Sequence, residues 1–137
     1  MSRGIRNRNP GNIRLSSVRY KGEVRPSRDV EFREFESMAW GYRALFVLLH
    51  TYARRHGCRT LRSMIMRYAP PSENPSGEYL RYVCRESGVG ADDEADTLDG
   101  HIMRAIVSAI SAFENGVPAD AAEVAEGWRL FLDDFGG

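Results

Sequence analysis

The chain has 137 residues, of which 42% are hydrophobic and 28% charged, which is typical of one globular domain with an adequate core. It contains no apolar run near the roughly 18 residues that a membrane-spanning helix needs, and its basic N-terminus lacks the apolar segment of a secretory signal. We therefore expect a cytoplasmic protein whose export would need lysis, a phage particle or another apparatus, and the oligomeric state stays open.

The formal net charge of zero conceals a strong asymmetry along the chain. Residues 1–70 hold 15 Lys and Arg against 5 Asp and Glu, whereas residues 71–137 hold 4 against 14. Two halves that pack against each other with complementary charge are the interpretation that we favour. The alternative is a basic face for an anionic partner, such as nucleic acid or a cell-wall polymer.

The first stretch, RGIRNRNPGNIR at residues 3–14, is too polar and too rich in Gly, Pro and Asn for a helix or a core strand. Residues 18–24 and 30–35 then alternate apolar and polar side chains, which predicts an antiparallel hairpin with one wet face. This N-terminal part, residues 1–36, is expected to pack on a helical part, residues 37–137, within a single domain of residues 1–137.

Five helices are predicted in the rest of the chain, mostly from their end signals. Ser37 and Gly57 bound the longest, at residues 38–56, and Thr60 begins a short helix that ends before two prolines. Asn74 and Pro75 begin the next helix, which Gly88 ends. Thr97 is expected to cap a helix that ends at Glu114, and the last helix begins near Pro118 and Asp120. The fold class is therefore mainly α (α+β): about five helices with a small N-terminal β-hairpin.

The motif R-G-I-R-N-x-N-P-G-N-I-R resembles the opening of a family of small phage-type "structural" or virion proteins, which also occur in Bacteroides-like genomes. The similarity continues through four later motifs, at residues 35–44, 68–74, 113–116 and 126–131, and so covers nearly the whole chain. The resemblance implies an association with lysozyme-like domains that degrade cell walls. Here, however, the helix that would carry the acid follows the hairpin, so we expect the order of elements to be circularly permuted relative to lysozyme-like enzymes.

Glycoside cleavage needs a carboxylic acid that can give a proton to the leaving oxygen. Glu114 is the best candidate, because the C-terminal end of a helix and an apolar neighbour both disfavour the charged form. Glu73, in a rigid turn between prolines, is the second candidate. The competing interpretations are an exposed helix-end residue for Glu114 and local hydrogen bonding within the turn for Glu73. Arg6, Asn9, Asn12 and Asn74 are the candidate substrate-binding residues, since Asn and Arg offer the hydrogen-bonding groups that sugars require.

Three functional hypotheses follow. The first is a lysozyme-like domain that acts on peptidoglycan, as a glycoside hydrolase or a lytic transglycosylase. The second is a non-catalytic virion module that binds a polymer or a partner protein. The third, nucleic-acid binding, is disfavoured, because the aromatic residues follow helix-core spacing instead of alternating with Arg. No cofactor and no metal site are expected from the spacing of the three His and two Cys, and Cys58 and Cys84 are read as free thiols in preference to a disulfide.

Overall fold

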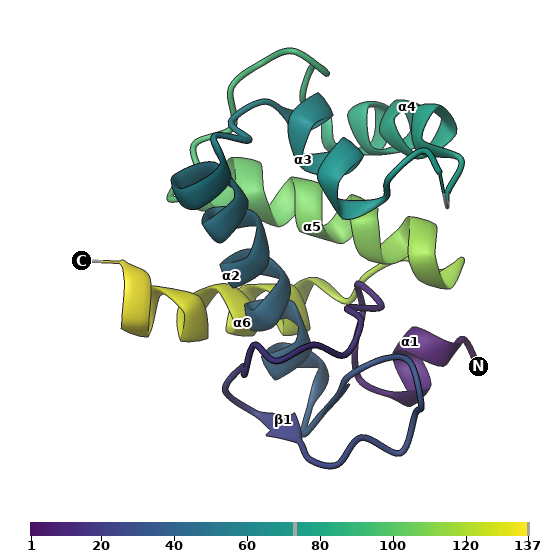
Figure 1. Cartoon of the computed structure of the whole chain (residues 1–137). Helices are drawn as coiled ribbons and strands as arrows, with labels where there is room; N and C mark the ends of the chain where they lie inside the picture. The colour runs from purple at the N-terminus through teal and green to yellow at the C-terminus, as the bar shows by residue number, and fades with distance from the viewer. Residues whose placement is uncertain (73, 137) are drawn as a thin grey trace.

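The computed structural model describes residues 1–72 and 74–136. Over these residues the chain forms six helices and two short strands. Figure 1 shows the N-terminal segment and the hairpin at one end of the molecule and α3 (Leu61–Tyr68) with α4 (Ser76–Ser87) at the other, while α2 (Met38–His56) runs between the two ends. The mainly helical fold class with a small N-terminal antiparallel sheet is confirmed.

The helices pack around α2 and α5 (Gly100–Asn115). Helix α6 (Ala121–Phe135) lies along α2, and α4 covers α5 on the other side. The core of this helical part contains fully buried side chains from all five long elements, including Phe46, Leu61, Val83, Ile106 and Phe131. A second, smaller cluster of Ile13, Tyr20, Phe35 and Ala44 joins the N-terminal segment to α2.

The end signals of α2 are confirmed. The hydroxyl oxygen of Ser37 accepts a hydrogen bond from the backbone of Trp40, and Gly57 ends the helix in the left-handed conformation with a φ of 67°. Likewise Thr60 caps α3 with a reciprocal Ser63 bond, and Gly88 ends α4. These ends were predictable because each depends on a local pairing between one side chain and the backbone beside it.

Four local predictions were wrong. Helix α4 begins at Ser76 with Pro75 in the capping position and without a side-chain cap, so Asn74 and Pro75 do not begin the helix as expected. Residues 3–6 form one helical turn, α1 (Arg3–Arg6), because the Ser2 hydroxyl accepts from the backbone of Ile5. The hairpin strands are only Glu23–Val24 (β1) and Glu34–Phe35 (β2), with an isolated bridge between Arg14 and Phe32. Helix α5 is capped by Asp99 and not by Thr97, whose hydroxyl instead pairs with His50.

No helix among the described residues is long and apolar enough to cross a membrane.

Candidate functional site

The N-terminal arm, which we define as residues 1–14, is tied to the end of α5 by side chains. The Asn115 amide nitrogen donates to the carbonyl of Pro10 at 2.9 Å, and its amide oxygen accepts from the Ser2 hydroxyl at 2.6 Å. Tyr68, at the end of α3, donates to the carbonyl of Gly11. A side chain at position 11 would collide with Tyr68 and Leu45, so this close approach requires glycine. Hydrogen bonds from Tyr68 and Asn115 therefore fasten the arm to the helical part.

Asn9 is the internal support of the arm. Its side chain is fully buried and donates to the carbonyls of Ile13 at 3.0 Å and Arg33 at 2.9 Å, while its oxygen accepts from the backbone of Ile13. All of these bonds go to the chain itself, so the Asn9 side chain supports the arm from inside. Our expectation that Asn9 binds substrate stays a prediction.

Asn12 and Glu114 meet although 102 positions separate them. The Asn12 amide donates to one carboxyl oxygen of Glu114 at 2.8 Å, and the Tyr79 hydroxyl donates to the other at 2.8 Å. Asn12 takes the left-handed conformation with a φ of 50°, which Asn tolerates better than most residues. The carboxyl group of Glu114 is thus held on both sides by residues from the arm and from α4.

The two tyrosines beside Glu114 are firmly protonated. Burial raises the pKa of Tyr79 well above its ordinary value, and the neighbouring Tyr68 and Glu114 raise it further. Burial and then the charge of Glu114 do the same to the pKa of Tyr68. Both hydroxyls therefore remain hydrogen-bond donors across the ordinary pH range, and that of Tyr79 donates to Glu114.

A groove of about 410 Å³ opens in front of Glu114. It lies between the arm, the first hairpin segment, α2 and the end of α3. Its lining, as far as the described residues show it, combines amides, arginines, aromatic rings and the Glu114 carboxylate. It includes Asn12, Arg14, Phe32, Arg33, Tyr52, Arg67, Tyr68 and Asn74.

Arginine side chains on the lining are stacked on aromatic rings. The guanidinium of Arg14 lies 5.2 Å from the ring centre of Phe32, and that of Arg67 lies 5.2 Å from the ring centre of Tyr52. Arg33 differs from both, because it is buried and its charge is paired with Glu23 at 2.7 Å.

The structure separates the candidate site residues into three groups. Asn12, Asn74 and Glu114 all line the groove. Arg6 is exposed on α1 and does not contribute to the lining, and Asn9 is buried behind it. Glu73 lies outside the described residues.

Sequence reasoning missed Tyr68, Tyr79, Arg14 and Arg67. The tyrosines belong to apolar helix faces, and that pattern predicts only core packing. The proximity of Arg14 and Arg67 to the groove depends on the fold and leaves no local signal.

Two larger hollows flank α4, with volumes of about 570 and 610 Å³. The first is lined mainly by alanines and other apolar groups of α5, and the second by apolar groups with arginines at its edge. Neither contains a set of converging hydrogen-bonding groups like the one around Glu114, so the smaller groove is the better candidate for recognition of a polar ligand.

The described residues contain no group of three or more His, Cys, Asp or Glu side chains placed to hold a metal ion. Cys58 and Cys84 are both free and half-buried.

The chain is similar to Protein P5 of Pseudoalteromonas phage PM2. The two are 33% identical over 118 residues, which cover 84% of this chain and 72% of the phage protein. No protein-family profile matches the chain. An alignment of this extent and identity shows that the chain belongs to the family of Protein P5, and this agrees with the phage-type resemblance of its motifs.

Proposed function

From membership in the P5 phage family, we propose that the chain is a virion-associated module that binds a cell-wall glycan, peptidoglycan in the first place, in the groove in front of Glu114. The observation that carries this proposal is the convergence of Asn12, Asn74 and Glu114 on one groove. Amides and a carboxylate offer donors and acceptors to sugar hydroxyls, and the aromatic rings nearby offer apolar faces to sugar rings.

Binding without cleavage is favoured by the contacts of the Glu114 carboxyl group. Both of its oxygens accept hydrogen bonds from the protein, whereas a general acid must present an O–H group to the substrate.

Cleavage of the glycan is the second candidate function. It is favoured by one observation: Glu114 is half-buried at the C-terminal end of α5 and is fixed at the groove by Asn12 and Tyr79. In this case Glu114 would be the proton donor, in a glycoside hydrolase or a lytic transglycosylase.

A pelleting assay with insoluble peptidoglycan tests binding. We expect the protein to sediment with the polymer, and Asn12→Ala to reduce its affinity about tenfold, since the groove loses an amide and the half-buried Glu114 carboxylate loses its donor. Arg6→Ala is the matched control, because Arg6 belongs to the same arm but lies outside the groove. Absence of sedimentation, or an equal loss in both variants, would contradict the proposal.

Release of soluble muropeptides from the same polymer tests cleavage. If cleavage occurs, Glu114→Gln should abolish release while the protein still sediments. If the unaltered protein releases no muropeptides over prolonged incubation, cleavage is excluded and glycan binding is the remaining function.

A further inference from the structure

We infer that the groove selects a glycan strand that carries carboxylate groups, and that Arg14 and Arg67 are the residues that make this selection. The inference rests on the proposed function, and it adds the charge of the ligand and the side chains that recognise it.

Arg14 and Arg67 reach the groove from different parts of the fold. Arg14 follows the last turn of the arm, and Arg67 lies in the last turn of α3. Both are exposed, and both belong to the lining. A ligand in the groove would therefore meet a cationic group from the arm and another from α3.

Stacking prepares both guanidinium groups for recognition. Phe32 lies under Arg14 and Tyr52 under Arg67, and each ring is itself part of the lining. A guanidinium held over a ring keeps its N–H edges available, and those edges match the two oxygens of a carboxylate. A ligand carboxylate can therefore pair with little additional ordering of the arginine.

The other charges of the groove leave this positive contribution in place. Arg33 is paired with the buried Glu23, so its charge is already balanced. Arg14 makes one longer contact with Glu31 at 3.4 Å, and both of these side chains are largely exposed. Such a pair contributes little and can exchange for a ligand carboxylate.

The position of Glu114 favours a carboxylated glycan over a nucleic acid. A phosphate backbone in the groove would bring one negative charge per nucleotide past the Glu114 carboxyl group. A glycan strand instead presents neutral hydroxyl groups there, which can donate to a carboxylate, and carries its acidic groups at intervals. The groove thus has a part suited to hydroxyls, around Asn12 and Glu114, and a part suited to acids, at the two arginines.

The test compares two forms of one ligand by calorimetry at low salt. The probe is a peptide-free glycan strand prepared from peptidoglycan, with its lactyl carboxylates either intact or converted to amides. We expect the amidated strand to bind about tenfold more weakly, because it loses charge-assisted bonds to arginine. The Arg14→Gln, Arg67→Gln double variant should bind both forms equally.

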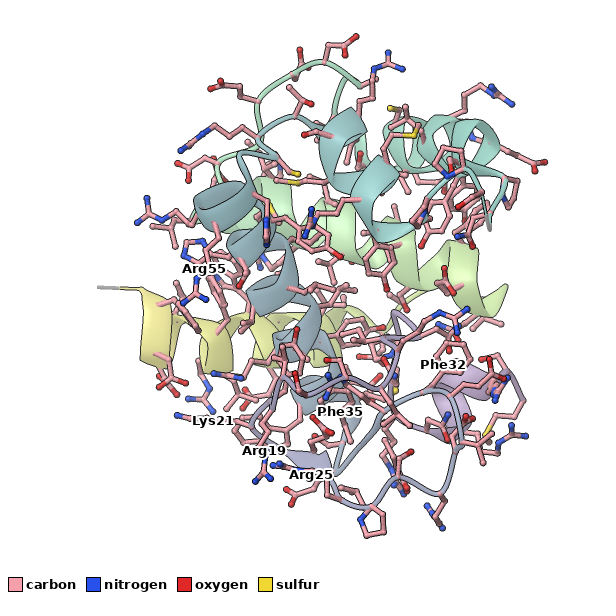
Figure 2. The ribbon with its side chains drawn as sticks, in the orientation of Figure 1. Arg19, Lys21, Arg25, Phe32, Phe35 and Arg55 are labelled. Atoms are coloured by element: carbon pink, nitrogen blue, oxygen red, sulfur yellow. The ribbon has the colours of Figure 1, made fainter. Side chains whose placement is uncertain are left out.

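Arg55→Gln is the control, since Arg55 is an exposed residue of α2 away from the lining, as Figure 2 shows. Equal binding of the two strands to the unaltered protein would overturn the inference and leave the proposed function intact. Failure of both strands to bind would overturn the proposed function itself. If the double variant still preferred the carboxylated strand, Arg14 and Arg67 would not be the selecting residues. If a single-stranded DNA oligomer bound more tightly than either glycan, the ligand would be a nucleic acid and the inference would be wrong.

Discussion

Asn9 and Asn12 stand three positions apart in one loop, yet their side chains have different roles. Asn9 bonds only to backbone groups of Ile13 and Arg33, whereas Asn12 reaches Glu114 at the other end of the chain. Both are polar and close to glycine or proline, so composition treats them alike. Their roles differ because one side chain points into the arm and the other points out of it toward α5.

Asn9→Ala should strongly destabilise the protein. The change orphans the Arg33 carbonyl and the Ile13 N–H, and each orphaned group costs about 1–3 kcal/mol. The Ile13 carbonyl loses one donor but still accepts from the Arg33 backbone. We expect a loss of about 3 kcal/mol in the free energy of unfolding, measured by urea denaturation. Arg6→Ala should change it by no more than about 0.5 kcal/mol. An equally small effect for Asn9→Ala would show that the arm does not depend on this side chain.

His50 should make stability depend on pH. Burial, and then the charge of Arg54, lower the pKa of this His below its ordinary value, while Nδ1 pairs with Thr97 at 2.7 Å. As the pH falls, His50 therefore takes up a proton in the unfolded chain before it does so in the folded protein. Its contribution to the free energy of unfolding is lost as the pH falls below about 6.5. Denaturation measured between pH 7 and pH 5 should show that the free energy of unfolding of the unaltered protein falls with pH. The slope should be the same in the control His101→Gln, which changes an exposed His, and smaller in His50→Gln. An unchanged slope in His50→Gln would assign the effect to another group.

At the scale of elements, the helix pair α2 and α6 shows what sets the distance between helices. A side chain at Gly127 of α6 would come within 2.6 Å of the Tyr42 Cβ and 2.9 Å of the Ala39 carbonyl oxygen, both on α2. Glycine in the middle of a helix is unfavourable by about 1 kcal/mol relative to alanine. The close packing of the two helices outweighs this cost.

Gly127→Ala should destabilise the protein by about 2 kcal/mol despite its better helix propensity, because the backbone of α2 has to move. Gly77→Ala in the first turn of α4 is the matched control: the added carbon would meet only the end of Arg81, at 3.5 Å. It should be neutral or stabilising by up to about 1 kcal/mol. Urea denaturation of both variants measures the difference, and stabilisation by Gly127→Ala would disprove the close contact.

Helix ends were predictable from the sequence where a single capping residue decides them. The prediction failed where two residues could both cap the same helix. Ser37 and Gly57 are unopposed at the ends of α2. Near the start of α5, Thr97 and Asp99 could both cap a helix, and the choice falls to Asp99 because tertiary packing directs the Thr97 hydroxyl to His50. For the candidate site, the sequence indicated Glu114 and Asn12 separately. Tyr79, which completes the contact, follows only from the packing of α4 on α5.

At the scale of the whole molecule, the basic first half and the acidic second half meet in specific pairs. Asp134 of α6 accepts from Lys21 at 2.9 Å and from Arg43 at 2.8 Å, and Arg62 pairs with Asp92 at 2.8 Å. The other ion pairs among the described residues lie within one half, as those of Arg33 with Glu23 and of Arg129 with Glu126 do, so opposite charges join the two halves at only a few places. Other basic residues, among them Arg19 and Arg25 beside Lys21 at the hairpin end, stay at the surface (Figure 2).

Asp134→Asn should cost markedly more stability than Lys21→Met. Arg43 is buried, so losing its carboxylate leaves a poorly solvated charge, whereas Lys21 is exposed and can turn to water. Lys21 and Arg43 hold the pKa of Asp134 below its ordinary value, so this contribution should also fade as the pH drops below about 4. Thermal denaturation at pH 7 and pH 3 measures both effects. Equal losses in the two variants at pH 7 would show that the Arg43 pair is unimportant.

The bond between Asn12 and Glu114 has a consequence for how the protein is made. During translation the arm leaves the ribosome early, but the residue that completes the groove emerges more than a hundred codons later. Until then Asn12 lacks the carboxylate to which it donates, and the groove lacks Glu114. A growing chain can therefore complete this groove only after the end of α5 has been synthesised.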